Sequence, residues 1–332
     1  MGKTVSVLGL CTLIAVSIVV LSACGGSGGD AANSIGGKVG DLIGGVAGGG
    51  KSTVDDDPDA PDRDNTPRVL VDTADGTATV GGDGATVDFS HAQDGYIMAK
   101  YEGDNSKVKI QITKDGGETY TYDIQGNTDF AGFPLSQGSG NYSVAMFLNV
   151  EGDKYSQACA QAVEADIADG FQPFLRPNQY CDYSSSTRSV AKGAEVAQGS
   201  KSDLKTIENV FVYVTGNVEY DYDKAATVQS GYVPNVDETL SSGKGICFDY
   251  ASLTTCMLRT QGIPCQLVVG YAGEAYHAWI SVHVEGVGWV ANMIQFDGDQ
   301  WTLMDPTFAS SGDTADPNAV GDGEHYNPVY YY

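Results

Sequence analysis

The stretch GKGICFDYASL, residues 243–253, predicts a turn followed by a helix, and the rest of the chain can be arranged around it. Cys247 follows the Gly-Lys-Gly turn, and apolar residues then recur at helical spacing until Gly262 and Pro264 interrupt the pattern. We therefore expect Cys247 at a helix N-terminus. There the N–H groups without partners in the helix, and the positive end of the helix dipole, favour a thiolate and can bind an oxyanion.

A second stretch, HAWISVHV at residues 277–284, alternates side chains in the manner of a half-buried strand. His277 lies on the face opposite the core, and His283 on the same face is a rival for its role. We prefer His277 because it lies at the strand end, where a sheet opens onto a cleft. QWTLMD at residues 300–305 predicts a later strand ending at Asp305, which can reach His277 if the two strands pair.

Cys247, His277 and Asp305 would then be nucleophile, general base and orienting carboxylate, the arrangement used in cysteine acyl transfer. Each residue also has an ordinary structural interpretation. Cys247 could simply pack within its helix, His277 could cap a strand, and Asp305 could belong to a turn. Because three separate placements would have to imitate a triad, we favour the catalytic interpretation.

Four segments in order, GKGICFDYASL, LRTQGIPCQLVVGY, HAWISV and WTLMDPTF, resemble the transglutaminase-like superfamily, which has a papain-type cysteine enzyme core of α+β fold. The resemblance covers residues 199–332 and implies Cys247 as nucleophile, His277 as general base and Asp305 as the residue that orients the imidazole. It leaves the substrate open, because the superfamily includes cross-linking enzymes, peptidases, deamidating enzymes and inactive members.

Residues 1–24 have the build of a bacterial lipoprotein signal peptide: one lysine, an apolar run, and Leu21-Ser22-Ala23 before Cys24. We expect Cys24 to be lipidated and to become the mature N-terminus. An ordinary signal peptide or an uncleaved anchor are the alternatives. All three place the bulk of the protein outside the cytoplasm, and the lipid anchor would hold it at the bacterial cell surface.

Residues 25–67 are rich in glycine, serine and aspartate and predict a flexible, solvated tether. Its Asp55-Asp56-Asp57 run lacks the Gly and the distal Glu of an EF-hand calcium loop. We therefore interpret the run as part of the linker.

Residues 68–198 are expected to form an antiparallel β-sandwich of immunoglobulin-like type and its connection to the catalytic domain. Short alternating segments are separated by turn signals. The strands are expected at residues 85–89, 95–101, 106–112, 118–124 and 141–150. The fold of residues 151–198 stays open. After it, Ser202 is a plausible N-cap for an amphipathic helix with its apolar stripe at Leu204, Ile207, Val210, Phe211 and Val214.

Composition limits the partners of the protein. The net charge of −25, from 43 acidic and 18 basic residues, argues against binding to nucleic acid and to anionic membrane surfaces. The membrane contact expected is the lipid anchor alone. No cysteine or histidine cluster has structural zinc spacing, and no metal or cofactor is implied; calcium dependence is left open.

Outside the first 24 residues the chain has five cysteines, an odd number that leaves at least one thiol unpaired in an exported protein. A free nucleophile at Cys247 explains this. A disulfide between Cys159 and Cys181 cannot be decided from sequence. Cys256 and Cys265 are interpreted as small core residues.

Two functional classes remain. In the first, the protein is an extracytoplasmic acyl-transfer enzyme that attacks peptide or glutamine-type amides of protein or cell-wall peptides and transfers the acyl group to an amine or to water. In the second, the core is an inactive scaffold that binds a partner at the surface. Several tyrosines could line an extended groove or could simply be packing. They are Tyr220, Tyr222, Tyr250, Tyr271 and Tyr276.

Overall fold

A computed structural model describes residues 59–124, 126, 129–285, 288–290, 293–296, 301–303 and 326–332. The predicted signal peptide with Cys24, most of the predicted tether, and Asp305 lie outside these residues. Within them, no helix combines the length and the apolar character needed to cross a membrane.

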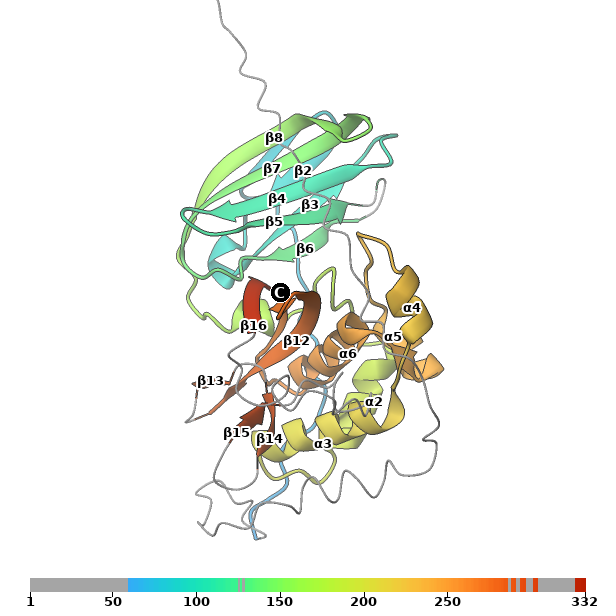
Figure 1. Cartoon of the computed structure of the whole chain (residues 1–332). Helices are drawn as coiled ribbons and strands as arrows, with labels where there is room; N and C mark the ends of the chain where they lie inside the picture. Colours follow the sequence, from blue (N-terminus) through green and yellow to red (C-terminus); the bar gives the residue numbers. More distant parts are fainter. Residues whose placement is uncertain are drawn as a thin grey trace, which may run out of the picture.

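The first part of the described chain is a sandwich of two antiparallel four-stranded sheets (Figure 1). One sheet has the order β1-β2-β3-β6, formed by β1 (Thr79–Gly82), β2 (Ala85–Asp88), β3 (Tyr96–Tyr101) and β6 (Ala131–Pro134). The other has the order β5-β4-β7-β8, formed by β4 (Val108–Lys114), β5 (Thr119–Ile124), β7 (Gly140–Glu151) and β8 (Lys154–Ala165). The predicted antiparallel sandwich is confirmed, and β8 extends it into the segment that the sequence left open.

The second part is a mixed domain built on the antiparallel sheet β13-β12-β11-β16. Its strands are β11 (Cys265–Ala272), β12 (Ala275–Val284), β13 (Gly288–Val290) and β16 (Tyr326–Tyr331). Helix α6 (Cys247–Thr260) packs on β11 and β12, and every residue of it from Asp249 to Thr260 is buried. Two short pairs complete the strands: parallel β9 (Glu219–Tyr220) with β10 (Lys244–Gly245), and antiparallel β14 (Met293–Phe296) with β15 (Trp301–Leu303).

Three helices surround α6 on the side away from the sheet. These are α2 (Arg188–Ala197), α3 (Asp203–Asn217) and α5 (Val236–Ser242), and the short α4 (Tyr222–Thr227) lies between α3 and α5 in the chain. Helix α3 confirms the predicted amphipathic helix, since Ser202 caps it by accepting a hydrogen bond from the Lys205 N–H. Helix α2 falls before the domain boundary predicted at residue 199, yet it packs on α6.

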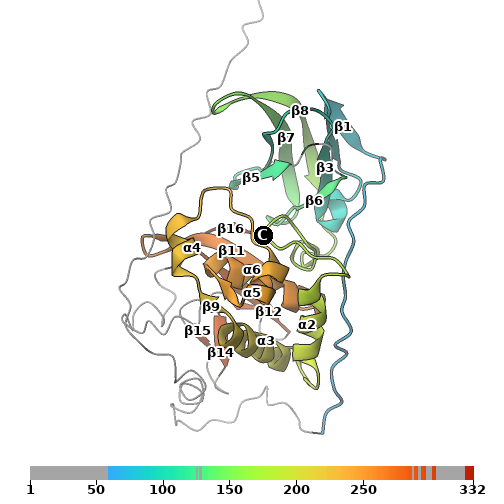
Figure 2. The ribbon, with the colours of Figure 1, turned by 90° about the vertical axis from the view of Figure 1, so that its right-hand side faces the viewer.

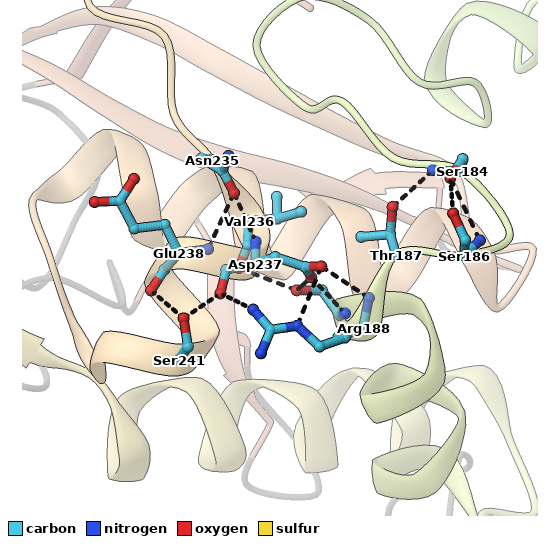
Figure 3. A network of polar contacts seen from close by, with 10 residues as sticks. Ser184, Ser186, Thr187, Arg188, Asn235, Val236, Asp237, Glu238 and Ser241 are labelled. Atoms are coloured by element: carbon cyan, nitrogen blue, oxygen red, sulfur yellow. Dashed lines mark hydrogen bonds and ion pairs between the residues drawn. The ribbon is translucent and has the colours of Figure 1, made fainter.

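A polar network at Asp237 joins α2 to α5 (Figure 3). The Asp237 carboxylate accepts from the backbone N–H groups of Arg188 at 3.0 Å and Ser189 at 2.8 Å, so a residue of α5 caps the first turn of α2. Asn235 in turn caps α5, because its side-chain oxygen accepts hydrogen bonds from the Asp237 N–H at 3.1 Å and from the Glu238 N–H at 3.0 Å. This network fixes α2 against α5, the helix that directly precedes the turn leading to Cys247.

Strand β12 is buried on both faces, so the prediction of a half-buried strand is wrong. Ala278 and Ile280 belong to the core that includes α6, while Trp279 and Ser281 on the other face are buried as well. The reason is that Trp279 reaches across the neighbouring strand to Tyr326 of β16, with ring centroids 4.9 Å apart.

Gly270 of β11 makes that crossing possible. A Cβ added there would lie 2.2 Å from the Asn327 carbonyl oxygen and 3.0 Å from the Trp279 ring. A larger residue at position 270 would therefore separate β16 from the sheet or displace the indole.

Residues 59–68, most of which were predicted to be flexible tether, instead pack along the helical domain. The Arg63 N–H bonds to the Ser200 carbonyl at 2.8 Å, and its guanidinium binds the carboxylate of Asp203. The Arg68 N–H bonds to the Thr260 carbonyl at 2.7 Å. Figure 2 shows this segment, in blue, running beside the helices before it reaches the sandwich. We refer to residues 59–68 as the strap.

The two domains meet around β16 and the connecting segment 166–187. Tyr120 of β5 accepts a hydrogen bond from the Tyr331 N–H at 2.9 Å, and its ring lies 5.4 Å from that of Tyr332. Tyr122 of the same strand contacts Tyr180 of the connecting segment, with centroids 5.7 Å apart. The sandwich is therefore fastened to β16, the edge strand of the sheet β13-β12-β11-β16.

Candidate active site

Helix α6 begins at Cys247, as the sequence predicted. Ile246, the N-cap, is extended, and the turn before it contains Gly243 at φ 63°, a conformation that suits glycine. Cys247 is partly exposed, whereas the other four cysteines in the described part of the chain are buried. Its sulfur is thus the accessible one at a helix N-terminus.

Burial makes the four other thiols poor nucleophiles. It raises the pKa of Cys181 to about 12 and that of Cys265 to about 11, and it also raises the pKa of Cys159 and Cys256. Cys159 and Cys181 are both free, the latter with its sulfur 3.4 Å from the Ser252 carbonyl oxygen. The disulfide considered from the sequence does not form in this structure.

One cavity brings Cys247 and His277 together. It has a volume of about 350 Å³, and both residues line it. His277 reaches it from β12 and is 9% exposed. His283, the rival considered from the sequence, is absent from the lining, and its ring packs on Phe171 with centroids 4.4 Å apart.

The strand pairing proposed to bring Asp305 to His277 is not found in the described residues. Strand β15 pairs with β14, and the neighbours of β12 are β11 and β13. The sequence suggested that these strands pair because successive strands usually do so. In the described residues, β14 and β15 instead form a separate two-stranded sheet. Asp305 itself is not among the described residues, so its role stays a prediction.

Segments far apart in the chain complete the cavity wall. Tyr271 and Tyr276 line it, as the groove interpretation allowed. Tyr220, Tyr222 and Tyr250 do not, and the Tyr250 hydroxyl instead donates to the Val218 carbonyl. Further lining residues were not expected from the sequence: Tyr180, residues 228–232, Val329, Tyr330 and Tyr332. The tyrosine-rich end of the chain, with its high β-propensity, was a signal for β16.

Asp249, two residues after Cys247, holds the head of α6 together. Its carboxylate accepts from the Ile246 N–H at 2.8 Å, which is half of a capping box, and from Lys224 Nζ at 2.8 Å. The Tyr232 hydroxyl donates to its second oxygen. Since Tyr232 belongs to the cavity wall, Asp249 joins the helix that begins at Cys247 to the loop 228–232 that lines the cavity.

Residues 190–306 match the model of the transglutaminase-like superfamily. The chain contains a transglutaminase-like domain. The match begins inside α2 and includes Cys247, His277 and Asp305. It confirms the transglutaminase-like domain expected from the sequence, and the structure places the strand-rich region before it.

Two curated relatives illustrate the similarity of the transglutaminase-like domain. A UPF0252 protein from Methanocaldococcus jannaschii is 33% identical over 102 residues, which cover 27% of this chain and 29% of the relative. The kyphoscoliosis peptidase of Mus musculus is 28% identical over 153 residues, which cover 41% of this chain and 21% of the peptidase. The chain thus spans less than a third of either relative.

Among solved structures, a transglutaminase from red sea bream matches with a TM-score of 0.30 and 12% identity, over 66% of this chain and 48% of that chain. A candidate cysteine protease from Cytophaga hutchinsonii matches with a TM-score of 0.35 and 15% identity, over 71% and 83%. These likenesses are weak, so the family assignment depends on the sequence match.

Proposed function

We propose that the transglutaminase-like domain is a cysteine acyl-transfer enzyme that acts on peptide or glutamine-type amides. The observation that carries the proposal is the shared cavity of Cys247 and His277, with Cys247 as the partly exposed thiol at the start of α6. The superfamily match and the peptidase relative support a cysteine-protease-like activity.

In the proposed reaction His277 takes the proton of Cys247, and the thiolate adds to the amide carbonyl. The backbone N–H groups at the start of α6 stabilise the negative oxygen that forms. The carbon–nitrogen bond then breaks, and ammonia or an amine leaves with the proton from His277. The resulting thioester passes to an amine or to water, and Asp305 would orient the imidazole throughout.

The proposed setting is the outside of a bacterial cell, with the protein held by a lipid on Cys24. The substrates would then be proteins or cell-wall peptides at the surface. The acidic chain, with its net charge of −25, fits a partner that is neither nucleic acid nor an anionic lipid surface.

Alkylation with iodoacetamide tests the proposal, with modified cysteines located by mass spectrometry. Cys247 should react quickly near neutral pH, and His277→Ala should slow the reaction on the order of 10-fold or more because the imidazole no longer takes the proton. His283→Ala is the matched control, since that histidine lies on the same strand but outside the cavity.

Two results would contradict the proposal. One is slow alkylation of Cys247 in the unmodified protein, which would favour the inactive scaffold. The other is equal alkylation rates in the His277→Ala and His283→Ala variants. On a panel of peptides, incorporation of a labelled amine would indicate transfer and formation of the free carboxylic acid would indicate hydrolysis, and Cys247→Ala should abolish both.

A further inference from the structure

Among the described residues, the wall of the cavity carries no ionisable side chain except those of Cys247, His277 and tyrosines. None of the described residues that line it is Asp, Glu, Lys or Arg. In a protein with 43 acidic residues this is a specific feature of the site. The lining is mostly aromatic, through residues such as Tyr180, Tyr232, Phe248, Tyr271, Tyr276 and Tyr330.

The rings face one another across three different segments. Phe248 of α6 lies 5.5 Å from Tyr180 and 6.5 Å from Tyr232, measured between ring centroids. On the sheet side, the rings of Tyr271 and Tyr276 meet edge to face at 5.4 Å. Burial of Tyr276 raises the pKa of its hydroxyl to about 12, so this phenol is neutral at physiological pH.

Behind the described part of the wall, the charges of Asp249 and Lys224 are already paired with each other. Asp249 is fully buried and bonded to Lys224 and to the Tyr232 hydroxyl. Apart from His277, the described lining residues offer a charged ligand no opposite charge in return for the water that it would lose. An aromatic ring would instead gain apolar burial and edge-to-face contacts.

The volume of the cavity limits what enters. At about 350 Å³ it is at the small end of the range for ligand pockets, roughly 300–1,000 Å³. It suits one side chain with its adjoining backbone.

From these features we propose that the cavity is the subsite for an uncharged side chain, preferably aromatic, beside the amide that Cys247 attacks. This deepens the proposed function and rests on it. The protein would act on peptides at aromatic or large aliphatic residues and would reject acidic and basic residues at that position.

A binding experiment tests the subsite without requiring turnover. The probes are N-acetyl amino-acid amides of Phe, Tyr, Leu, Gln, Asp and Lys, titrated by ligand-observed NMR against the full chain carrying Cys247→Ser. The Phe and Tyr probes should bind at least about 10-fold more tightly than the Asp and Lys probes, because aromatic rings gain apolar burial and ring contacts, whereas the described lining offers charged probes no charged partner besides His277.

Placing a charge in the wall gives a second, sharper measurement. Val329→Lys should raise the affinity for the Asp probe relative to the Phe probe, since Val329 lines the cavity. Asn327→Lys is the matched control on the same strand, because Asn327 is exposed and is not part of the lining. If Val329→Lys does not fold, Ser230→Lys places the same charge on an exposed position of the covering loop.

The proposal is overturned if the Asp or Lys probe binds the Cys247→Ser chain as well as the Phe probe does. It is equally overturned if the folded wall variant and Asn327→Lys rank the probes alike. If Cys247 is alkylated slowly but the chain still prefers aromatic probes, the proposed enzymatic activity is rejected. The cavity would then be a binding site for uncharged side chains.

Discussion

Lys224 Nζ lies 2.8 Å from the Asp249 carboxylate, so α4 is fixed to the helix that carries Cys247. Asp249 has no exposed surface, and the Lys224 side chain keeps 27% of its own. A buried carboxylate with one partly solvated cation and two further donors is satisfied only while all three segments stay in place.

Asp249→Ala should therefore lower the free energy of unfolding by about 2–4 kcal/mol, because it leaves the Ile246 N–H, Lys224 and the Tyr232 hydroxyl without their acceptor. Urea denaturation provides the measurement. Asp223→Ala, an exposed acid on α4, is the control and should change stability by less than about 0.5 kcal/mol. Equal losses in the two variants would show that Asp249 does not join these segments.

Acid should weaken the α2–α5 junction through Asp237. Burial alone would raise the pKa of this carboxyl, but the Arg188 and Ser189 N–H groups, the Ser189 hydroxyl and the charge of Arg188 together lower it below its ordinary value of 3.8. The stability it contributes is thus present above pH 3.8 and is lost as pH falls through the lower, folded pKa.

The check is the pH dependence of unfolding. Asp237→Ala should lose about 1–2 kcal/mol near neutral pH, as expected for a lost cap, and should show a shallower fall in stability below pH 3.8. Glu238→Ala, on an exposed position of the same helix, should keep the original slope. A slope unaffected by Asp237→Ala would argue against this assignment.

His91 should give the sandwich a pH dependence of the opposite sign. Its hydrogen bond with Asp94, at 2.7 Å, and the charge of Asp75 raise the pKa of the imidazole above 6.5. The charged form stabilises the fold, so this contribution is complete below pH 6.5 and is lost as pH rises through the folded pKa. In the His91→Gln variant, the midpoint temperature of thermal unfolding should change less with pH as the pH rises above 6.5. An unchanged midpoint profile would show that another group is responsible.

Two neighbouring tyrosines of β5 should respond oppositely to removal of the hydroxyl. The Tyr122 hydroxyl is buried and has no hydrogen-bond partner in the described part of the protein, so Tyr122→Phe should raise the free energy of unfolding by about 1–3 kcal/mol. Tyr120→Phe should lower it by about 1 kcal/mol because its hydroxyl accepts from the Tyr331 N–H. Guanidinium titrations of both variants decide the matter, and changes of the same sign would refute it.

Local patterns were enough to predict α6, α3 and the main strands of the sandwich. The turn before Cys247, the cap at Ser202 and the alternation along β4 are all encoded within a few residues. The sharing of one cavity by Cys247 and His277 was also foreseen, because each was placed at the end of its element.

What escaped prediction depends on contacts between distant segments. The burial of Trp279 needs Tyr326 from β16, and the cavity wall needs Tyr180 and the loop 228–232. Periodicity within β12 could not reveal which strands would be its neighbours. Asp305 was expected to reach His277 through pairing of their two strands, but in the described residues β12 pairs with β11 and β13.

The strap has a consequence for limited proteolysis. Because Arg63 and Arg68 hold the beginning of the described chain against the helices, the sandwich is bound to its neighbour by residues on both sides of it in the sequence. A single cut in the connecting segment 166–187 would leave two fragments that still migrate as one particle until denaturant is added.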